Sequence, residues 1–97
     1  MLYQVYYKKD ISLDADEAMQ NFETNFVPVM RLDEENLEDV YFVMQAENWS
    51  PNGEARQAIE DLGLSHTSMS VGDVVEEIET GRQFIVDSFS YEIYPKE

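Results

Sequence analysis

The sequence predicts an α+β fold in which a small mixed or antiparallel sheet of about four or five strands is covered on one face by two or three helices. Runs rich in β-branched and aromatic residues lie near both ends of the chain, and apolar residues recur at helical spacing between them. The last third contains two β-rich runs that are typical of a C-terminal hairpin. A chain of 97 residues can build one hydrophobic core, so we expect a single domain over residues 1–97.

The N-terminal third predicts a strand, a helix and a second strand. Aromatic and branched residues favour a strand over residues 2–7. Asp14 opens a stretch with apolar residues at helical spacing, which predicts a helix from residue 15 to about residue 25. Pro28 interrupts this pattern, and the valines and methionine beside it favour a strand over residues 26–32 in which the proline lies near the start or on an edge.

Two helices are predicted in the middle of the chain. Asp33 is a good helix cap, and Glu34 and Glu35 would then lie in the first turn, where the helix dipole favours negative charge. Ser50 is expected to cap a further helix that ends at Gly63. The first of these helices is the better defined, because its apolar stripe has the spacing i, i+3, i+4, i+7 and consists of Leu37, Val40, Tyr41 and Met44.

The last third predicts the C-terminal hairpin, with strands over residues 71–79 and 83–94 joined by a turn at residues 80–81. A bend near residues 87–90 would split the second run. Because alternate residues of a strand share a face, each strand can bury one side, and we expect the helices to cover a single face of the sheet. In the second run, the apolar residues at alternate positions, which are expected to share one face, are Ile85, Phe89, Tyr91 and Ile93.

Charge and composition narrow the classes of function. The chain has 21 Asp and Glu against 6 Lys and Arg, a formal charge of −15, so direct binding to nucleic acid or to an anionic membrane is disfavoured, whereas basic protein surfaces are attracted. A simpler interpretation is that the charge only aids solubility. No stretch approaches the about 18 apolar residues of a membrane span, and the start of the chain does not resemble a signal peptide, so we expect a cytoplasmic protein. The absence of cysteine excludes disulfides and thiolate metal sites.

The sequence offers little evidence for catalysis or metal binding. A Ser/His/Asp constellation can be drawn from Ser68 or Ser70, the single histidine His66, and Asp73 or Asp87. Their spacing matches no nucleophile motif, and a turn histidine that bonds nearby groups is the better interpretation. The acidic clusters do not match a calcium-binding loop. We therefore expect no enzyme activity, no metal and no cofactor.

The tail contains a sequence motif in two parts. Residues 65–75 read S-H-T-S-M-S-V-G-D-V-V, and residues 84–91 read F-I-V-D-S-F-S-Y. This resembles the "H-x-S-M-S-V-G-D-V" run and "V-D-S-F-G-F" hairpin of YodL-like domains and other small proteins of phages, plasmids and mobile elements. Ser90 stands where those proteins tend to carry glycine, and the L-E-D-V-Y segment at residues 37–41 precedes Trp49 in the matching order. The resemblance implies a mobile-element setting and no established activity.

The motif also has a structural interpretation, in which Gly72 permits a tight turn and Asp73 accepts hydrogen bonds from nearby backbone amides. Such a local cap contributes about 1 kcal/mol to stability. The functional hypothesis is a non-enzymatic, partner-binding protein whose acidic face occupies the nucleic-acid groove of a host defence or replication protein; the alternative is an accessory domain whose charge serves solubility. The candidate partner-binding residues are Glu34, Glu35, Glu38, Asp39, Trp49 and Asp73.

Overall fold

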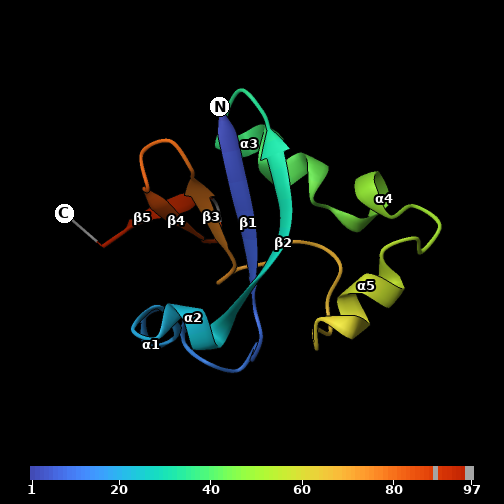
Figure 1. The fold of residues 1–97 in the computed structure, drawn as a ribbon, viewed down its shortest axis with the longest axis horizontal. Coiled ribbons are helices and arrows are strands. Elements are labelled where there is room, and N and C mark those ends of the chain that lie inside the picture. Colours follow the sequence, from blue (N-terminus) through green and yellow to red (C-terminus); the bar gives the residue numbers. More distant parts are fainter. Residues whose placement is uncertain (89, 96–97) are drawn as a thin grey trace.

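A five-stranded antiparallel sheet with the strand order β2-β1-β3-β4-β5 forms the centre of the protein (Figure 1). The computed structural model describes residues 1–88 and 90–95. This architecture confirms the predicted α+β class, the small sheet and the C-terminal hairpin. The strands are β1 (Leu2–Lys8), β2 (Phe26–Asp33), β3 (Val74–Glu77), β4 (Gln83–Val86) and β5 (Tyr91–Tyr94).

The helices are short. The helix predicted from residue 15 to about residue 25 is divided at Asn21, and this division turns α2 so that the Phe22 ring packs against Tyr6 and Phe26, with ring centroids 4.8 and 4.9 Å apart. Packing of this aromatic side chain therefore takes precedence over a continuous helix. The helices are α1 (Ala15–Met19), α2 (Phe22–Asn25), α3 (Leu37–Val43), α4 (Ala46–Trp49) and α5 (Arg56–Asp61).

The start of α3 differs from the prediction. Asp33 does not cap this helix, because β2 extends to Asp33, which pairs with Leu2 of β1. The N-cap is Asn36, whose side-chain oxygen accepts a hydrogen bond from the backbone N–H of Asp39 at 2.9 Å. Glu34 and Glu35 consequently precede the helix, and its first turn carries Glu38 and Asp39 instead.

The predicted third helix also begins later than expected. Ser50 is not its N-cap, because α5 starts at Arg56; the Ser50 hydroxyl accepts a hydrogen bond from the backbone N–H of Ala55 at 2.8 Å in the preceding turn. The predicted end is confirmed, since Gly63 has a φ of 76° and the N–H of Leu64 bonds back to the helix.

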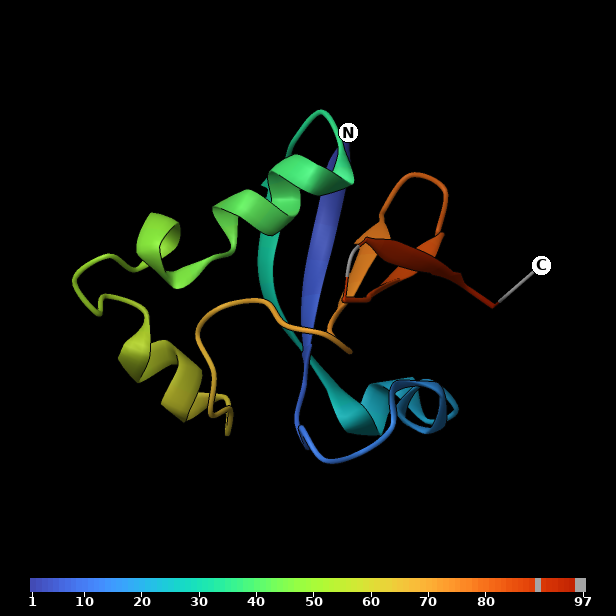
Figure 2. The ribbon, with the colours of Figure 1, turned by 180° about the vertical axis from the view of Figure 1, so that it is seen from behind.

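Helices contact both faces of the sheet, so the prediction of a single covered face is wrong. One core cluster joins α3 and α5 to residues such as Val75 and Val86, and a second joins α1 to Val74 and Ile85, which point to the opposite face. Figure 2 shows α3 in front of β1 and β2, α4 and α5 to the side of β2, and α1 and α2 together at one end of the strands.

The predicted parity of the last run is also corrected. β4 and β5 are separate strands, as the predicted split of this run requires, and they pair as a hairpin in which Ile85 lies opposite Glu92 and Val86 lies opposite Tyr91. Tyr91 and Ile93 therefore share a face with Phe84 and Val86, and Ile85 faces the other way. Phe89, which was predicted to share that parity, lies outside the described residues.

Candidate functional site

The turn before β3 is built around the carboxylate of Asp73, which is 1% exposed. One oxygen, Oδ1, accepts the backbone N–H of Lys8 at 2.8 Å, and the other, Oδ2, accepts the backbone N–H of Ser70 at 2.8 Å. The Nε2 atom of His66 also donates to Oδ2 at 3.0 Å. The predicted role of Asp73 in holding this turn by backbone hydrogen bonds is confirmed, and the carboxylate lies inside the protein rather than on a contact surface.

Aromatic residues enclose the other side of this turn. The His66 ring stacks on Tyr7 with the ring centroids 4.7 Å apart, and the Tyr7 hydroxyl donates to the Thr67 carbonyl at 2.6 Å. Burial, together with the charge of Asp73, raises the pKa of Tyr7. Trp49 is half-buried against the core, and its indole N–H donates to the same Thr67 carbonyl at 3.2 Å. Trp49 therefore closes this segment of the protein and does not stand beside the acidic residues of α3 as an exposed anchor.

No serine completes a nucleophilic triad with His66 in the described part of the chain. The Ser68 hydroxyl accepts the backbone N–H of Ala46 at 2.8 Å, and the Ser70 hydroxyl donates to the Ser68 carbonyl at 3.4 Å. The second ring nitrogen of His66, Nδ1, is buried and has no partner among the described residues. In a triad, the ring nitrogen that does not contact the carboxylate faces a reactive hydroxyl. In this structure the bond from His66 Nε2 to Asp73 links two positions of the same turn segment.

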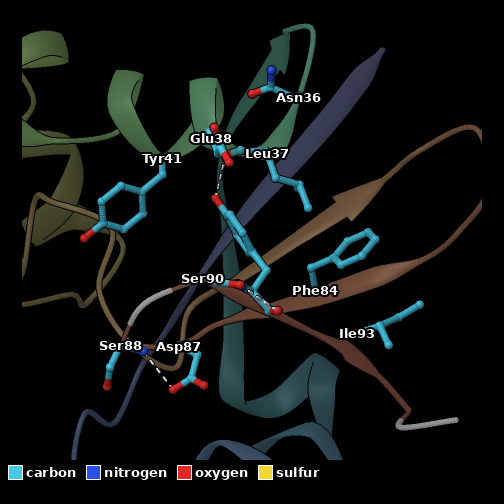
Figure 3. A pocket seen from close by; sticks show the side chains of 10 residues that line it. Asn36, Leu37, Glu38, Tyr41, Phe84, Asp87, Ser88, Ser90 and Ile93 are labelled. Atoms are coloured by element: carbon cyan, nitrogen blue, oxygen red, sulfur yellow. Dashed lines mark hydrogen bonds between the residues drawn. The ribbon is translucent and has the colours of Figure 1, made fainter.

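A groove opens between α3 and the β4–β5 hairpin, with a volume of about 790 Å³ (Figure 3). Figure 3 shows Leu37, Glu38 and Tyr41 on the helix side of this groove and Phe84 and Ile93 on the strand side. The hydrogen bonds and exposures of these residues decide what the groove presents. Its complete lining is Asn36, Leu37, Glu38, Tyr41, Phe84, Asp87, Ser88, Ser90, Tyr91 and Ile93.

Tyr91 links the two sides of the groove. Its hydroxyl donates to the Leu37 carbonyl at 2.8 Å, and burial raises the pKa of this phenol. The bond joins β5 to the first residue of α3, so the groove has a fixed back wall. Two exposed carboxylates, Glu38 on α3 and Asp87 in the turn after β4, also belong to its lining.

The structure separates the predicted partner-binding residues into two groups. The segment at the end of β2 and the start of α3 keeps Glu34, Glu35, Glu38 and Asp39 together, and among these only Glu38 lines the groove. Trp49 and Asp73 lie elsewhere, in the packing around Thr67 and the turn before β3 respectively. The groove residues contributed by the hairpin were missed because their contact with α3 spans 54 residues, from Leu37 to Tyr91.

A second, smaller cavity of about 170 Å³ lies between the start of α1 and the sheet. Its lining includes the acidic residues Asp14, Asp16, Asp87 and Glu92. No three His, Asp or Glu side chains among the described residues are arranged to hold a metal ion. None of the helices in the described ranges has the length and hydrophobicity that a membrane-spanning helix requires.

Comparison with known proteins gives no relative for this chain: no family model matches it, and neither a curated protein nor a solved structure does. The resemblance of the tail to YodL-like domains therefore stays a hypothesis based on the motif.

Proposed function

We propose that this chain is a non-enzymatic protein that uses its acidic surface to bind a basic surface of a partner protein. The observation that carries the proposal is the exposure of its carboxylates. Every described Asp and Glu except Asp73 is at least partly exposed. The formal charge of −15 therefore lies at the surface, where it attracts and steers positively charged partners.

Few ion pairs offset this charge among the described residues. Two carboxylates form ion pairs in residues 1–88 and 90–95, not counting Glu92. Asp33 pairs with the N-terminal ammonium at 3.1 Å, and Asp73 pairs with His66. Some exposed carboxylates are held in the charged form. Hydrogen bonds from Ser12 lower the pKa of Asp10, and backbone hydrogen bonds near Asn52 lower the pKa of Glu54. A basic partner would supply the missing positive charge.

The distribution of the charge bears on the kind of partner. Acidic residues occur on helices of both covering layers, for example Asp16 and Glu17 on α1 and Glu60 and Asp61 on α5. The charge distribution therefore does not indicate one binding face. It also gives no support to a model in which rows of carboxylates imitate the phosphates of a nucleic acid. In the mobile-element setting that the tail motif suggests, the partner would be a host protein with a basic nucleic-acid groove.

The experiment is an affinity pull-down from a lysate of the source cells with the purified protein immobilised. Bound proteins are identified by mass spectrometry after washes at about 50 mM and about 500 mM salt, because screening weakens contacts between exposed charges. We expect the retained proteins to have basic surfaces and to leave at high salt. A retained set that is not basic, or that resists high salt, would favour the alternative in which the charge serves solubility alone.

A further inference from the structure

The groove between α3 and the β4–β5 hairpin differs from the rest of the acidic surface because it combines apolar walls with charge. Its apolar walls consist of the side chains of Leu37, Phe84 and Ile93. Tyr41, which is 41% exposed, also lines the groove. A volume of about 790 Å³ is in the range of sites that enclose drug-sized ligands and exceeds the space of a single side chain.

The carboxylates in the lining favour a positively charged ligand. Glu38 and Asp87 come from opposite sides of the groove, α3 and the turn after β4, and both are exposed. Neither forms an ion pair with a described Lys or Arg. An acidic peptide, a nucleic acid and a second copy of this chain, which also carries a charge of −15, would all be repelled.

We propose that this groove binds a short segment of a basic partner protein in which an apolar side chain is flanked by arginine or lysine; this inference rests on the proposed function and locates it. The apolar side chain packs between Leu37 and Phe84. The flanking cations reach Glu38 and Asp87, and their aliphatic stems lie against the Tyr41 ring, which also offers a cation–π contact. Tyr91 keeps the two walls at a fixed separation through its bond to Leu37, so little ordering is needed on binding.

The test uses synthetic peptides as probes. A peptide of alternating arginine and leucine is titrated into the protein by calorimetry at about 50 mM salt, in parallel with an arginine–serine peptide and a glutamate–leucine peptide of equal length. We expect the arginine–leucine peptide to bind at least about tenfold more tightly than the arginine–serine peptide, which lacks the apolar side chain, and the acidic peptide not to bind. Equal affinity for the two arginine peptides would overturn the groove assignment and leave the general acidic attraction intact.

Two pairs of matched variants locate the binding. Glu38→Gln with Asp87→Asn removes the groove carboxylates, and Glu60→Gln with Asp61→Asn removes two exposed carboxylates on α5, so the net charge changes equally. We expect the first pair to weaken binding of the arginine–leucine peptide by about tenfold and the second by less than about twofold. Equal weakening by both pairs refutes the groove and keeps the proposed function, whereas no binding of either arginine peptide to the wild-type protein refutes both.

The apolar wall is tested separately on α3. Tyr41→Ser changes the groove, and Phe42→Ser changes a neighbouring side chain that is 65% exposed and lies outside the groove lining. We expect only Tyr41→Ser to weaken the arginine–leucine peptide, and both variants to keep melting temperatures near that of the wild type because both side chains are exposed. Loss of binding in Phe42→Ser and not in Tyr41→Ser would place the contact on another face of the helix.

Discussion

The carboxylate of Asp73 accepts the backbone N–H of Lys8 at 2.8 Å and so fastens the end of β1 to a turn 65 residues later in the chain. The same side chain holds Ser70 and His66, so three donors depend on one buried group. This turn therefore joins distant segments of the chain. We expect Asp73 to contribute more to the free energy of unfolding than a side chain that caps only its own turn.

Replacing Asp73 tests this junction. Asp73→Ala leaves the donors of Lys8, Ser70 and His66 without their acceptor, and each buried donor without a partner is costly. We expect a loss of about 2 to 4 kcal/mol in the free energy of unfolding, measured by urea denaturation, instead of the about 1 kcal/mol of a local cap. Asp16→Ala, at an exposed position of α1, is the control and should cost less than about 1 kcal/mol. A loss at Asp73 no larger than this control would show that water replaces the carboxylate.

The turn also depends on the absence of a side chain at Gly72. This residue has a φ of 95°, and a Cβ added there would lie 2.9 Å from the Nζ atom of Lys8, a buried residue whose ammonium donates to the Leu13 carbonyl. Gly72→Ala therefore has two costs. The backbone is strained at this positive φ, and the new methyl group displaces the Lys8 ammonium. Gly53, with a φ of 82° and open space around it, supplies the matched control for strain alone.

We expect Gly72→Ala to be less stable than Gly53→Ala by about 1 kcal/mol or more in urea melts, because the Lys8 hydrogen bond is lost. Combining Gly72→Ala with Lys8→Ala removes the atom that the new methyl group meets. In that double variant the two substitutions should cost less than the sum of their separate effects. If the two losses of stability simply add, the contact between the new methyl group and the Lys8 ammonium does not affect stability.

The corrected cap of α3 gives a third prediction. Asn36→Ala removes the acceptor for the Asp39 N–H and should lower the free energy of unfolding by about 1 kcal/mol. Asp33→Ala, at the position that the sequence favoured as the cap, removes only an exposed pair with the N-terminal ammonium and should cost between about 0 and 1 kcal/mol. Circular dichroism during thermal melting ranks the two variants, and the reverse ranking would restore Asp33 as the cap.

The raised pKa of Tyr7 predicts sensitivity to alkali. Below about pH 10 the phenol is protonated in both folded and unfolded chains, so its contribution to stability is constant. Above that pH the unfolded chain releases the proton and the folded protein retains it, so the free energy of unfolding falls as pH rises. The slope for one such tyrosine is about 1.4 kcal/mol per pH unit.

Urea melts of the wild type and Tyr7→Phe between about pH 9 and pH 11.5 measure this slope. We expect Tyr7→Phe to be less stable at pH 9, because it loses the hydrogen bond to Thr67, and to show a flatter decline above pH 10. Parallel curves for the two proteins would mean that Tyr7 ionises freely in the folded state.

Local sequence patterns predict most of the elements whose formation depends on neighbouring residues. The aromatic and branched residues at positions 2–7 and the spacing of Val40 and Met44 predict a strand and a helix that the structure contains. Gly63 marks the end of a helix, and the turn at residues 80–81 joins two strands. These features follow from backbone preferences and from the periodicity of apolar residues, which act within a few positions of the chain. The excess of acidic residues is likewise a property of the sequence alone.

Which distant segments come into contact depends on the tertiary packing. The pairing of Leu2 with Asp33 moved the helix cap to Asn36, and the packing of Phe22 on Phe26 divided the first helix. The groove has the same origin, because it exists only where the hydrogen bond from Tyr91 to the Leu37 carbonyl brings β5 against α3. Sequence periodicity shows that a residue has an apolar neighbour on one side, but the identity of that neighbour depends on packing between distant segments, which no local pattern encodes.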